Sequence, residues 1–387
     1  MNLDNSVVVL RPGPCGSADR AHNQDVTPRK VAAGLTWTVV VPVLDLSRRG
    51  SRYRDAFVAA VDRVLTSGAV LLGPEIKAFE EEFAAFTGYA HCVAVSSGAT
   101  ALQLSLVAKG VGPGDEVIVP AHTAVPTASA VLATGATPVM VDVDCATGAL
   151  EITAAKLAVT DRTKVVIPVH LYGRPATLPI GLGLPVLEDA AQAHGALHAN
   201  DCSFATAYSF YPTKNLGGIG DGGAVVTNDP DLADRLRRLR AHGMQAQYVH
   251  VDISQNFRMS EIEAAWLRLL LPDLRQANAR RQEAMAAYRA AAPHLRFHPE
   301  HPDHVYHLAV VRSANRDAYR ASLAEHGVAT GIHYPLAVTQ QPAYQHLARQ
   351  ACPQAEAWAA ECVSLPCFPE ITDEEIAQVA AALAATP

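Results

Sequence analysis

From about Tyr53 onward, short apolar runs alternate with stretches in which apolar residues recur at helical spacing. The apolar runs are nearly continuous, which is typical of strands buried on both faces of a parallel sheet. The pattern therefore predicts an α/β fold, a three-layer αβα domain with a mostly parallel sheet. The predicted strands span 91–97, 115–120, 137–144, 163–170, 184–191, 205–212 and 222–229. The predicted helices span 54–68, 74–88, 99–110, 122–135, 151–158 and 230–243.

The pattern also divides the chain. A long helical stretch, 259–293, contains Pro272, which predicts a break or bend because proline lacks a backbone donor. After it, further helical and apolar segments predict a smaller α+β unit, whereas the first residues are polar and show no periodicity. We therefore predict three parts. They are a loosely ordered extension, 1–36, a large domain that includes the connecting helix, 37–292, and a small C-terminal domain, 293–387.

Charge and composition narrow the classes of partner. With 31 basic and 38 acidic residues the net charge is −7, which offers no basic field for nucleic acid. No apolar run approaches the roughly 20 residues that cross a bilayer. The seven cysteines are scattered and form no disulfide pattern, so we expect a cytoplasmic protein that binds a small molecule.

The segment SFYPTKNLGGIGDGG contains a G-x-G-x-x-G match at Gly218, Gly220 and Gly223. A dinucleotide-binding loop needs a strand before these glycines and a helix after them. Here they run into the predicted strand 222–229, so we interpret them as loop residues that turn the chain between two strands.

Lys214 and Asp189 are stronger candidates. Each lies just at or beyond the end of a predicted strand, where α/β sheets bind their ligands. A desolvated lysine can form a Schiff base, and a carboxylate can keep a pyridine nitrogen protonated, which is the pair that pyridoxal phosphate (PLP) chemistry requires. Ser96–Gly98, between a strand and a helix, could bind the phosphate through free N–H groups, and Ser209 could add a hydroxyl.

Several motifs together resemble a known family. The chain from about Val41 to Val379 is similar to the DegT-type nucleotide-sugar aminotransferases, a branch of the fold-type I, aspartate-aminotransferase-like PLP enzymes. The motifs are GPEIKAFEEEFA, HLYGRPA, EDAAQAHGA, YSFYPTKNLG, GDGGAVVTND and NFRMSEIEAAW. The resemblance implies the PLP-transferase fold type I for the large domain.

By this resemblance Lys214 forms the Schiff base with PLP and later shuttles a proton at the reacting carbon. Asp189 pairs with the pyridinium nitrogen, and Gln192 bonds the phenolic oxygen of the cofactor. Because Lys214 serves as acid and base, we read His170 and His194 as structural supports. We expect no metal.

The resemblance also assigns the phosphate site and a dimer. Gly98 and Ala99 present backbone N–H groups to the phosphate, and Ser209 adds its hydroxyl. Asn256 reaches the phosphate of the neighbouring subunit's cofactor, so we expect a homodimer. Ala99 stands where the family usually has threonine.

Substrate residues are expected in GIHYPLAVTQQPAYQ, which borders the substrate in relatives and contributes His333 and Tyr334. Arg258 could pair with a carboxylate or phosphate of the substrate. Ala124 stands where the family commonly stacks an aromatic ring on the cofactor, with His122 as a candidate substitute.

The sequence therefore predicts a PLP-dependent aminotransferase that moves an amino group from glutamate or glutamine to a keto group of a nucleotide-linked deoxysugar. The expected setting is secondary-metabolite or surface-polysaccharide biosynthesis. A ketocyclitol acceptor of the aminoglycoside type is the alternative. A PLP-binding regulatory protein and a sugar dehydratase are less favoured, since dehydratase relatives carry histidine in place of Lys214.

Overall fold

The computed structural model describes residues 40–196 and 199–386. These residues belong to one compact unit, Val39–Pro387. The predicted extension 1–36 lies outside the described residues. The boundary predicted at residue 293 stays a prediction, because the described chain forms one unit across it.

A central sheet runs in the order β3-β2-β4-β5-β6-β7-β1. Its two hydrogen-bonded parts, β3-β2-β4 and β5-β6-β7-β1, are joined by parallel bridges from Val166 to Val186 and from Val169 to Asp189. All neighbours along it are parallel except β7, which is antiparallel to β6 and β1. This confirms the predicted mostly parallel sheet. The strands are β1 (His91–Val95), β2 (Glu116–Pro120), β3 (Thr137–Val141), β4 (Thr163–Val166), β5 (Leu187–Asp189), β6 (Ala205–Ser209) and β7 (Gly223–Thr227).

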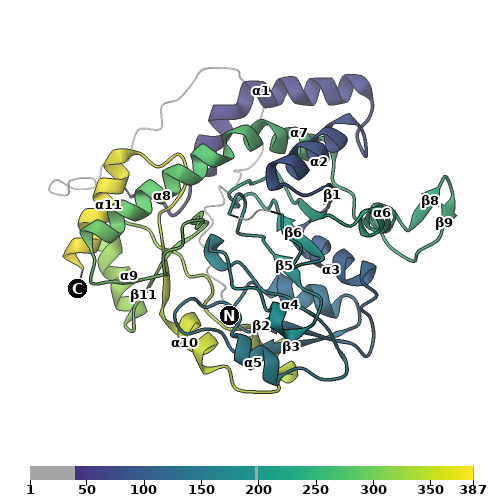
Figure 1. Ribbon diagram of the computed structural model, residues 1–387. Coiled ribbons are helices and arrows are strands. Elements are labelled where there is room, and N and C mark those ends of the chain that lie inside the picture. The colour runs from purple at the N-terminus through teal and green to yellow at the C-terminus, as the bar shows by residue number, and fades with distance from the viewer. Residues whose placement is uncertain (1–39, 197–198, 387) are drawn as a thin grey trace, which may run out of the picture. The chain divides into compact units, whose positions relative to one another are not determined.

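Helices cover both faces of this sheet (Figure 1). In β1, Cys92 and Ala94 pack with α2 and α7, whereas Val93 and Val95 pack with α3 and α6. This alternation within one strand is what a sheet between two helical layers requires. The helices of this part are α1 (Leu46–Ser67), α2 (Pro74–Thr87), α3 (Gly98–Ala108), α4 (Val125–Leu132), α5 (Ile152–Leu157), α6 (Pro230–Leu239), α7 (Glu261–Leu270) and α8 (Leu274–Ala291).

A second, antiparallel sheet lies in the C-terminal part, in the order β10-β11-β12. It packs with α8, α9 and α11 around a core of its own, which includes Tyr288, Val311 and Leu383. The predicted break at Pro272 is confirmed, since a short 3₁₀ turn separates α7 from α8. The elements are β10 (Arg296–Phe297), β11 (Ala309–Arg312), α9 (Arg316–Glu325), α10 (Pro353–Glu361), β12 (Cys362–Leu365) and α11 (Asp373–Ala385). The 3₁₀ turns are η1 (Leu171–Gly173), η2 (Ile180–Leu182), η3 (Leu271–Asp273), η4 (Val338–Gln340) and η5 (Gln345–Leu347).

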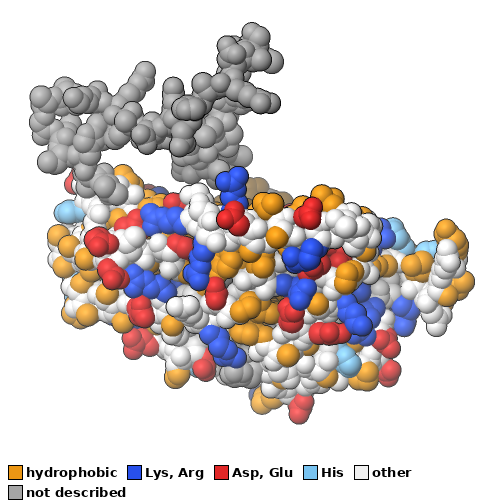
Figure 2. Space-filling view, turned by 90° about the horizontal axis from the view of Figure 1, so that it is seen from above, with side chains coloured by type: hydrophobic (Ala, Val, Ile, Leu, Met, Phe, Trp, Pro, Cys, Tyr) orange, Lys and Arg blue, Asp and Glu red, His pale blue; other side chains and the backbone are white. Residues whose placement is uncertain are grey.

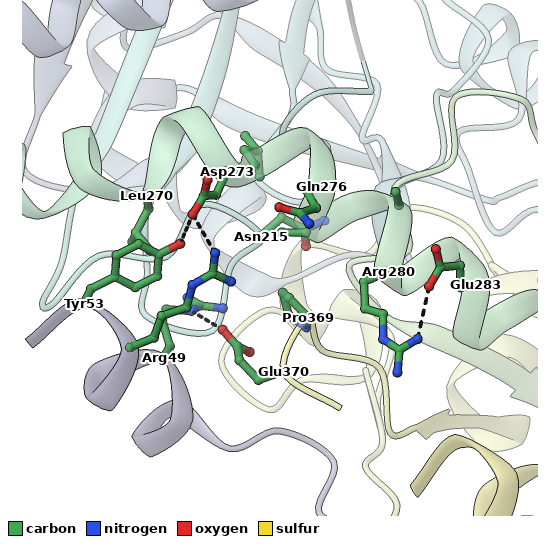
Figure 3. A pocket seen from close by; sticks show the side chains of 14 residues that line it. Arg49, Tyr53, Asn215, Leu270, Asp273, Gln276, Arg280, Glu283, Pro369 and Glu370 are labelled. Atoms are coloured by element: carbon green, nitrogen blue, oxygen red, sulfur yellow. Dashed lines mark hydrogen bonds and ion pairs between the residues drawn. The ribbon is translucent and has the colours of Figure 1, made fainter. Parts of the chain in front are cut away.

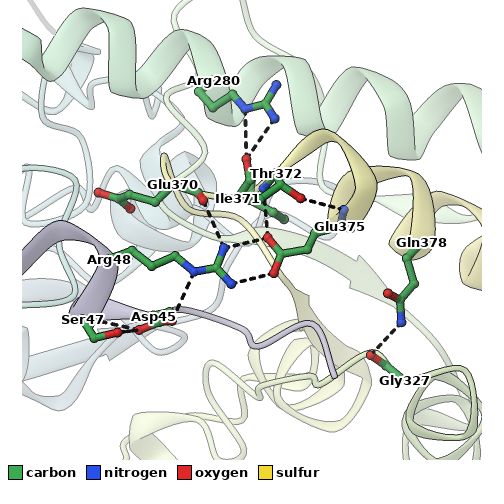
Figure 4. A network of polar contacts seen from close by, with 10 residues as sticks. All are labelled: Asp45, Ser47, Arg48, Arg280, Gly327, Glu370, Ile371, Thr372, Glu375 and Gln378. Carbon is green, nitrogen blue, oxygen red and sulfur yellow. Dashed lines mark hydrogen bonds and ion pairs between the residues drawn. The ribbon is translucent and has the colours of Figure 1, made fainter. Parts of the chain in front are cut away.

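The first helix begins earlier than its apolar pattern predicted. Helix α1 starts at Leu46, where the Asp45 side chain accepts the Ser47 N–H at 3.0 Å. Its first turns carry arginines that pair with other elements: Arg48 forms two hydrogen bonds, 2.6 and 2.7 Å, to the Glu375 carboxylate (Figure 4). Charged pairs to distant parts of the chain leave no apolar periodicity, so the sequence pattern missed the first turns of the helix.

A hairpin of β8 (Met244–Ala246) and β9 (Val249–His250) follows α6 and was not predicted. It projects from the body at the right of Figures 1 and 2. Its apolar side chains are exposed, with Tyr248 at 84% and the following Ile253 at 102% of full exposure. A projecting apolar segment of this kind is typical of a surface that another chain covers.

Glu261 ties α7 to the start of α2. Its carboxylate is fully buried and accepts N–H groups of Gly73 and Glu75 at 2.7 Å and of Ile76 at 3.2 Å. Replacing Glu261 with alanine leaves these donors unpaired, so we expect the free energy of unfolding to fall by about 2–4 kcal/mol in urea titrations. The matched control is Glu81→Ala on α2, whose carboxylate is 69% exposed and should change stability by less than about 0.5 kcal/mol. Equal losses in the two variants would contradict this capping role.

Candidate functional site

The ends of two adjacent parallel strands bring a carboxylate close to a lysine. Asp189 is the last residue of β5, is 4% exposed, and accepts hydrogen bonds from Thr127 Oγ1 at 2.8 Å and from the Ala191 N–H at 3.1 Å. Burial raises the pKa of Asp189, while Thr127, the Ala191 N–H and the charge of Lys214 act against that rise. The site therefore holds a desolvated carboxylate whose negative charge the neighbouring groups stabilise.

Lys214 follows β6 in a turn closed by its own N–H, which donates to Tyr211 O at 2.8 Å. Burial lowers the pKa of the Lys214 amine to about 8, and the Asp189 carboxylate opposes this shift. The lysine lines a cavity of about 370 Å³ together with residues of the C-terminal part, among them His307, His333 and Tyr334. An amine with this pKa is partly neutral near neutral pH and can act as a nucleophile.

The start of α3 has the features of a phosphate cradle. Among the described residues, the N–H groups of Gly98 and Ala99 have no hydrogen-bond partner, while Ser97 Oγ caps the helix by accepting the Thr100 N–H at 3.1 Å. A Cβ on Gly98 would lie 2.5 Å from Ser209 Cβ, which places the Ser209 hydroxyl beside the helix N-terminus. Free N–H groups, a helix N-terminus and a hydroxyl together suit a dianion.

Gly223, the last glycine of the G-x-G-x-x-G match, completes this cradle. A Cβ there would overlap the backbone of Ser97, and one on Gly218 would overlap the Glu263 carboxylate. Gly218, Gly220 and Gly223 do not adopt positive φ. Two of these glycines are therefore needed for close approach of the backbone rather than for a left-handed turn.

Gln192 is held in one orientation. Its Oε1 accepts the Tyr172 N–H at 2.5 Å, and its Nε2 donates to Tyr334 Oη at 2.9 Å. One N–H of the amide remains without a partner among the described residues. This free donor fits the phenolic oxygen of the cofactor, the role that the resemblance implied.

Two predicted site residues lie elsewhere. Asn256 is exposed on the segment after β9, and its Oδ1 accepts a 2.9 Å hydrogen bond from Arg258 Nε. Neither residue lines the cavity that contains Lys214. Within one chain, the structure does not bring them to the site.

Three histidines near the site either form hydrogen bonds to other protein groups or are buried away from solvent. His170 Nε2 lies 2.9 Å from Glu188 Oε2, while its Nδ1 accepts the Ala176 N–H at 2.9 Å. His194 is fully buried, with neither ring nitrogen partnered, and burial lowers its pKa to about 3. His122, 1% exposed, lies over Trp358 with ring centroids 5.9 Å apart.

Another cavity, of about 230 Å³, opens between α1, η3, α8 and the segment after β12 (Figure 3). Its charged side chains are largely paired with one another: Asp273 accepts hydrogen bonds from Tyr53 at 2.5 Å and from Arg52 at 2.9 Å. It contains neither Lys214 nor Asp189. The cavity at Lys214 is therefore the candidate active site.

Sequence reasoning missed Thr127 and His307. Thr127 lies on α4, 62 positions before the Asp189 carboxylate to which it donates, and His307 belongs to the C-terminal part. Neither stands in a motif, and only the folded arrangement places them at the site.

These residues fit pyridoxal phosphate. The start of α3 offers donors to a dianionic phosphate, and Asp189 offers a carboxylate to a protonated ring nitrogen. Gln192 has a spare donor, and Lys214 presents an amine with a lowered pKa.

Comparisons with known proteins identify the family. The family model for the DegT/DnrJ/EryC1/StrS aminotransferase family matches residues 52–384. The chain is 45% identical over 362 residues to the erythromycin biosynthesis sensory transduction protein EryC1 of Saccharopolyspora erythraea, covering 89% of this chain and 99% of that protein. It is 44% identical over 348 residues to the dTDP-3-amino-3,4,6-trideoxy-alpha-D-glucose transaminase of Streptomyces venezuelae, covering 86% and 92%. A solved structure of S. venezuelae DesV in complex with a ketimine intermediate superposes with a TM-score of 0.86 at 43% identity, covering 90% of this chain and 98% of that one.

The lowered pKa of Lys214 can be measured on the cofactor-free protein. Because only the neutral amine reacts, acetylation of Lys214 by acetic anhydride should rise with pH and reach half its maximal rate near pH 8 rather than near the ordinary pKa of 10.5. Peptide mass spectrometry gives the rate, with the 80% exposed Lys77 as the internal reference for the reagent.

In Asp189→Asn the midpoint should move to lower pH, because the carboxylate that raises the lysine pKa is gone. A midpoint near 10.5, or one that Asp189→Asn leaves unchanged, would contradict the coupling of the two charges.

Proposed function

Since the chain belongs to the DegT/DnrJ/EryC1/StrS aminotransferase family and is a PLP-dependent aminotransferase, we propose that its acceptor is the keto group of a nucleotide-linked deoxysugar. The amino donor is glutamate or glutamine. The observation that carries the aminotransferase chemistry is the electrostatic coupling of the buried Lys214 and Asp189 near adjacent strand ends, beside the phosphate cradle. The transaminase of S. venezuelae, whose name specifies a dTDP-linked amino sugar, supports the substrate class.

The residues have distinct tasks in this proposal. When bound, pyridoxal phosphate supplies an aldehyde to which amines attach and a ring that takes up the electron pair of a broken C–H bond. With the cofactor bound, Lys214 Nζ would hold its aldehyde and, once released, would move a proton to or from the amino-bearing carbon. Asp189 would keep a proton on the ring nitrogen, in a position that is 4% exposed to water.

His333 and Tyr334 are proposed to contact the substrate from the far wall of the cavity. Both line it, and His333 Nδ1 lies 2.8 Å from Ser364 Oγ, which fixes the ring. Apolar side chains of Val43, Leu44 and Leu365 line the same cavity. A wall that mixes apolar and hydrogen-bonding groups suits a sugar that has lost some of its hydroxyls.

A regulatory role is the second candidate, because EryC1 bears a name that refers to sensory transduction. The presence of both Lys214 and Asp189 favours an enzyme over a regulatory protein. The two candidates are distinguished by whether an amino donor converts the bound cofactor to its amine form.

Adding L-glutamate or L-glutamine to the loaded protein should convert the cofactor to its amine form, which is visible as a change of absorbance. Lys214→Ala should slow this conversion by about 10²–10⁴-fold, because the proton-transfer group is lost. The matched control is Lys77→Ala, a lysine with an 80% exposed side chain, which should leave the rate unchanged.

The amine form should then transfer its amino group to dTDP- or UDP-linked keto-deoxysugars. No conversion by any amino donor would favour the regulatory candidate, and transfer to ketocyclitols alone would replace the proposed substrate class.

We also propose a homodimer in which Asn256 completes the partner's phosphate site. Asn256 is exposed and lies away from its own cavity. It follows the projecting hairpin, whose exposed apolar residues suit burial by a second chain. Loss of Asn256 then affects the partner's site rather than its own.

Mixing two inactive variants tests this arrangement. Lys214→Ala and Asn256→Ala homodimers should each be impaired, whereas exchange of subunits should restore activity at about a quarter of the sites, since half the dimers are mixed and each has one intact site. Activity after mixing is compared with the activity of each unmixed variant. As a control, the double variant Lys214→Ala/Asn256→Ala mixed with either single variant should restore no activity. Failure of the mixture to exceed its components would contradict the shared site.

No helix of the described residues is long and apolar enough to cross a membrane. We also propose a cytoplasmic location, which the free thiols of the described cysteines support.

A further inference from the structure

His307 lies just before β11 and lines the cavity that contains Lys214. It is 7% exposed. The hydrogen bonds around it determine which of its ring nitrogens carries the proton, and hence what it can recognise.

The chain of contacts starts at Asn215, the residue after Lys214. Its Nδ2 donates to Val305 O at 3.0 Å and to Asn278 Oδ1 at 2.8 Å. Asn278 is oriented in turn, since its own Nδ2 donates to His194 O at 2.8 Å. Two backbone carbonyls, which can only accept, therefore fix the orientation of both amides.

This orientation turns Asn215 Oδ1 toward His307 Nδ1, at 3.2 Å. An amide oxygen accepts only, so His307 Nδ1 must carry the proton and donate it. In a neutral imidazole the other nitrogen, Nε2, is then an acceptor with a free lone pair.

His307 lines the cavity, and Nε2 is the ring nitrogen that the bond to Asn215 leaves free. Among the described residues Nε2 has no hydrogen-bond partner, yet, unlike the ring nitrogens of His194, it is not sealed from solvent. Burial lowers the pKa of His307 well below its ordinary value, and the positive charges of Lys214 and Arg281 lower it further. The ring therefore stays neutral, and Nε2 accepts hydrogen bonds at ordinary pH.

We propose that His307 Nε2 binds the sugar substrate by accepting a hydrogen bond from a ring hydroxyl near the reacting carbon. This inference rests on the proposed function, because it concerns the substrate of that site. A hydroxyl can donate to this lone pair, whereas the two carboxylates of a glutamate donor cannot. His307 is thus a specificity residue that serves the sugar half of the reaction and not the half-reaction with glutamate.

Two substitutions separate the two ring nitrogens. His307→Asn places an amide N–H near the position of Nδ1, which keeps the bond to Asn215 and removes the acceptor in the cavity. His307→Gln reaches toward the position of Nε2, which keeps an acceptor in the cavity and removes the bond to Asn215. The variants are therefore matched controls for each other.

The loaded protein is mixed rapidly with either L-glutamate or dTDP-3-amino-3,4,6-trideoxy-α-D-glucose, an amino sugar whose ring has one free hydroxyl. Absorbance gives the apparent second-order rate constant of each half-reaction. In His307→Asn we expect the constant for the amino sugar to fall about 5- to 30-fold and that for glutamate to stay within about 2-fold. The rate constant of His307→Gln for the amino sugar should be closer to the wild-type value than that of His307→Asn.

A deoxy analogue of the amino sugar, lacking the ring hydroxyl, should react equally with the wild type and His307→Asn. The unfolding temperature of each loaded variant serves as a second measurement, and His307→Asn should match the wild type.

Equal losses in both half-reactions, or a greater loss with the amino sugar in His307→Gln than in His307→Asn, would overturn the assignment and make His307 a support for Asn215. A wild type that reacts with glutamate but with neither dTDP- nor UDP-linked amino sugars would overturn the proposed substrate class, and the hydroxyl contact with it.

Discussion

The electrostatic coupling of Lys214 and Asp189 is the interaction on which the rest of the site depends. Each group is desolvated, and each stabilises the charged form of the other: burial lowers the lysine pKa and raises the aspartate pKa, while their mutual attraction opposes both shifts. Such a pair persists only where the fold holds both groups out of water. Adjacent parallel strands achieve this, because β5 and β6 end side by side at the carboxyl edge of the sheet.

The surrounding contacts keep this pair in place. Close approach at Gly98 and Gly223 brings the start of α3 against β6 and β7, so the phosphate cradle lies beside the turn that contains Lys214. On the other side, Asn215 anchors the same turn to α8 through Asn278 and to the C-terminal part through Val305. The turn is thus fixed from two directions, which limits the positions that the lysine amine can reach.

Much of the fold could be predicted because apolar periodicity is a local signal. The strands of the central sheet follow from it, whereas the break at Pro272 follows from the proline itself. Lys214 and Asp189 could be identified because strand ends gather ligand-binding groups. The first turns of α1 escaped prediction because Arg48 is stabilised by Glu375, far away in the chain. Thr127 and His307 escaped it for the same reason: their hydrogen bonds to Asp189 and Asn215 cross 62 and 92 positions, and no short pattern encodes such pairs.

The most direct test of the central claim, that Lys214 holds the cofactor, is chemical trapping. Sodium borohydride reduces the linkage between an amine and the cofactor aldehyde to a stable bond, and peptide mass mapping of the reduced, loaded protein locates it. We predict the added cofactor mass on the peptide that contains Lys214, and the loss of this added mass in Lys214→Ala. Label on another lysine, such as Lys109 or Lys164, or cofactor bound with no trapped lysine, would contradict it.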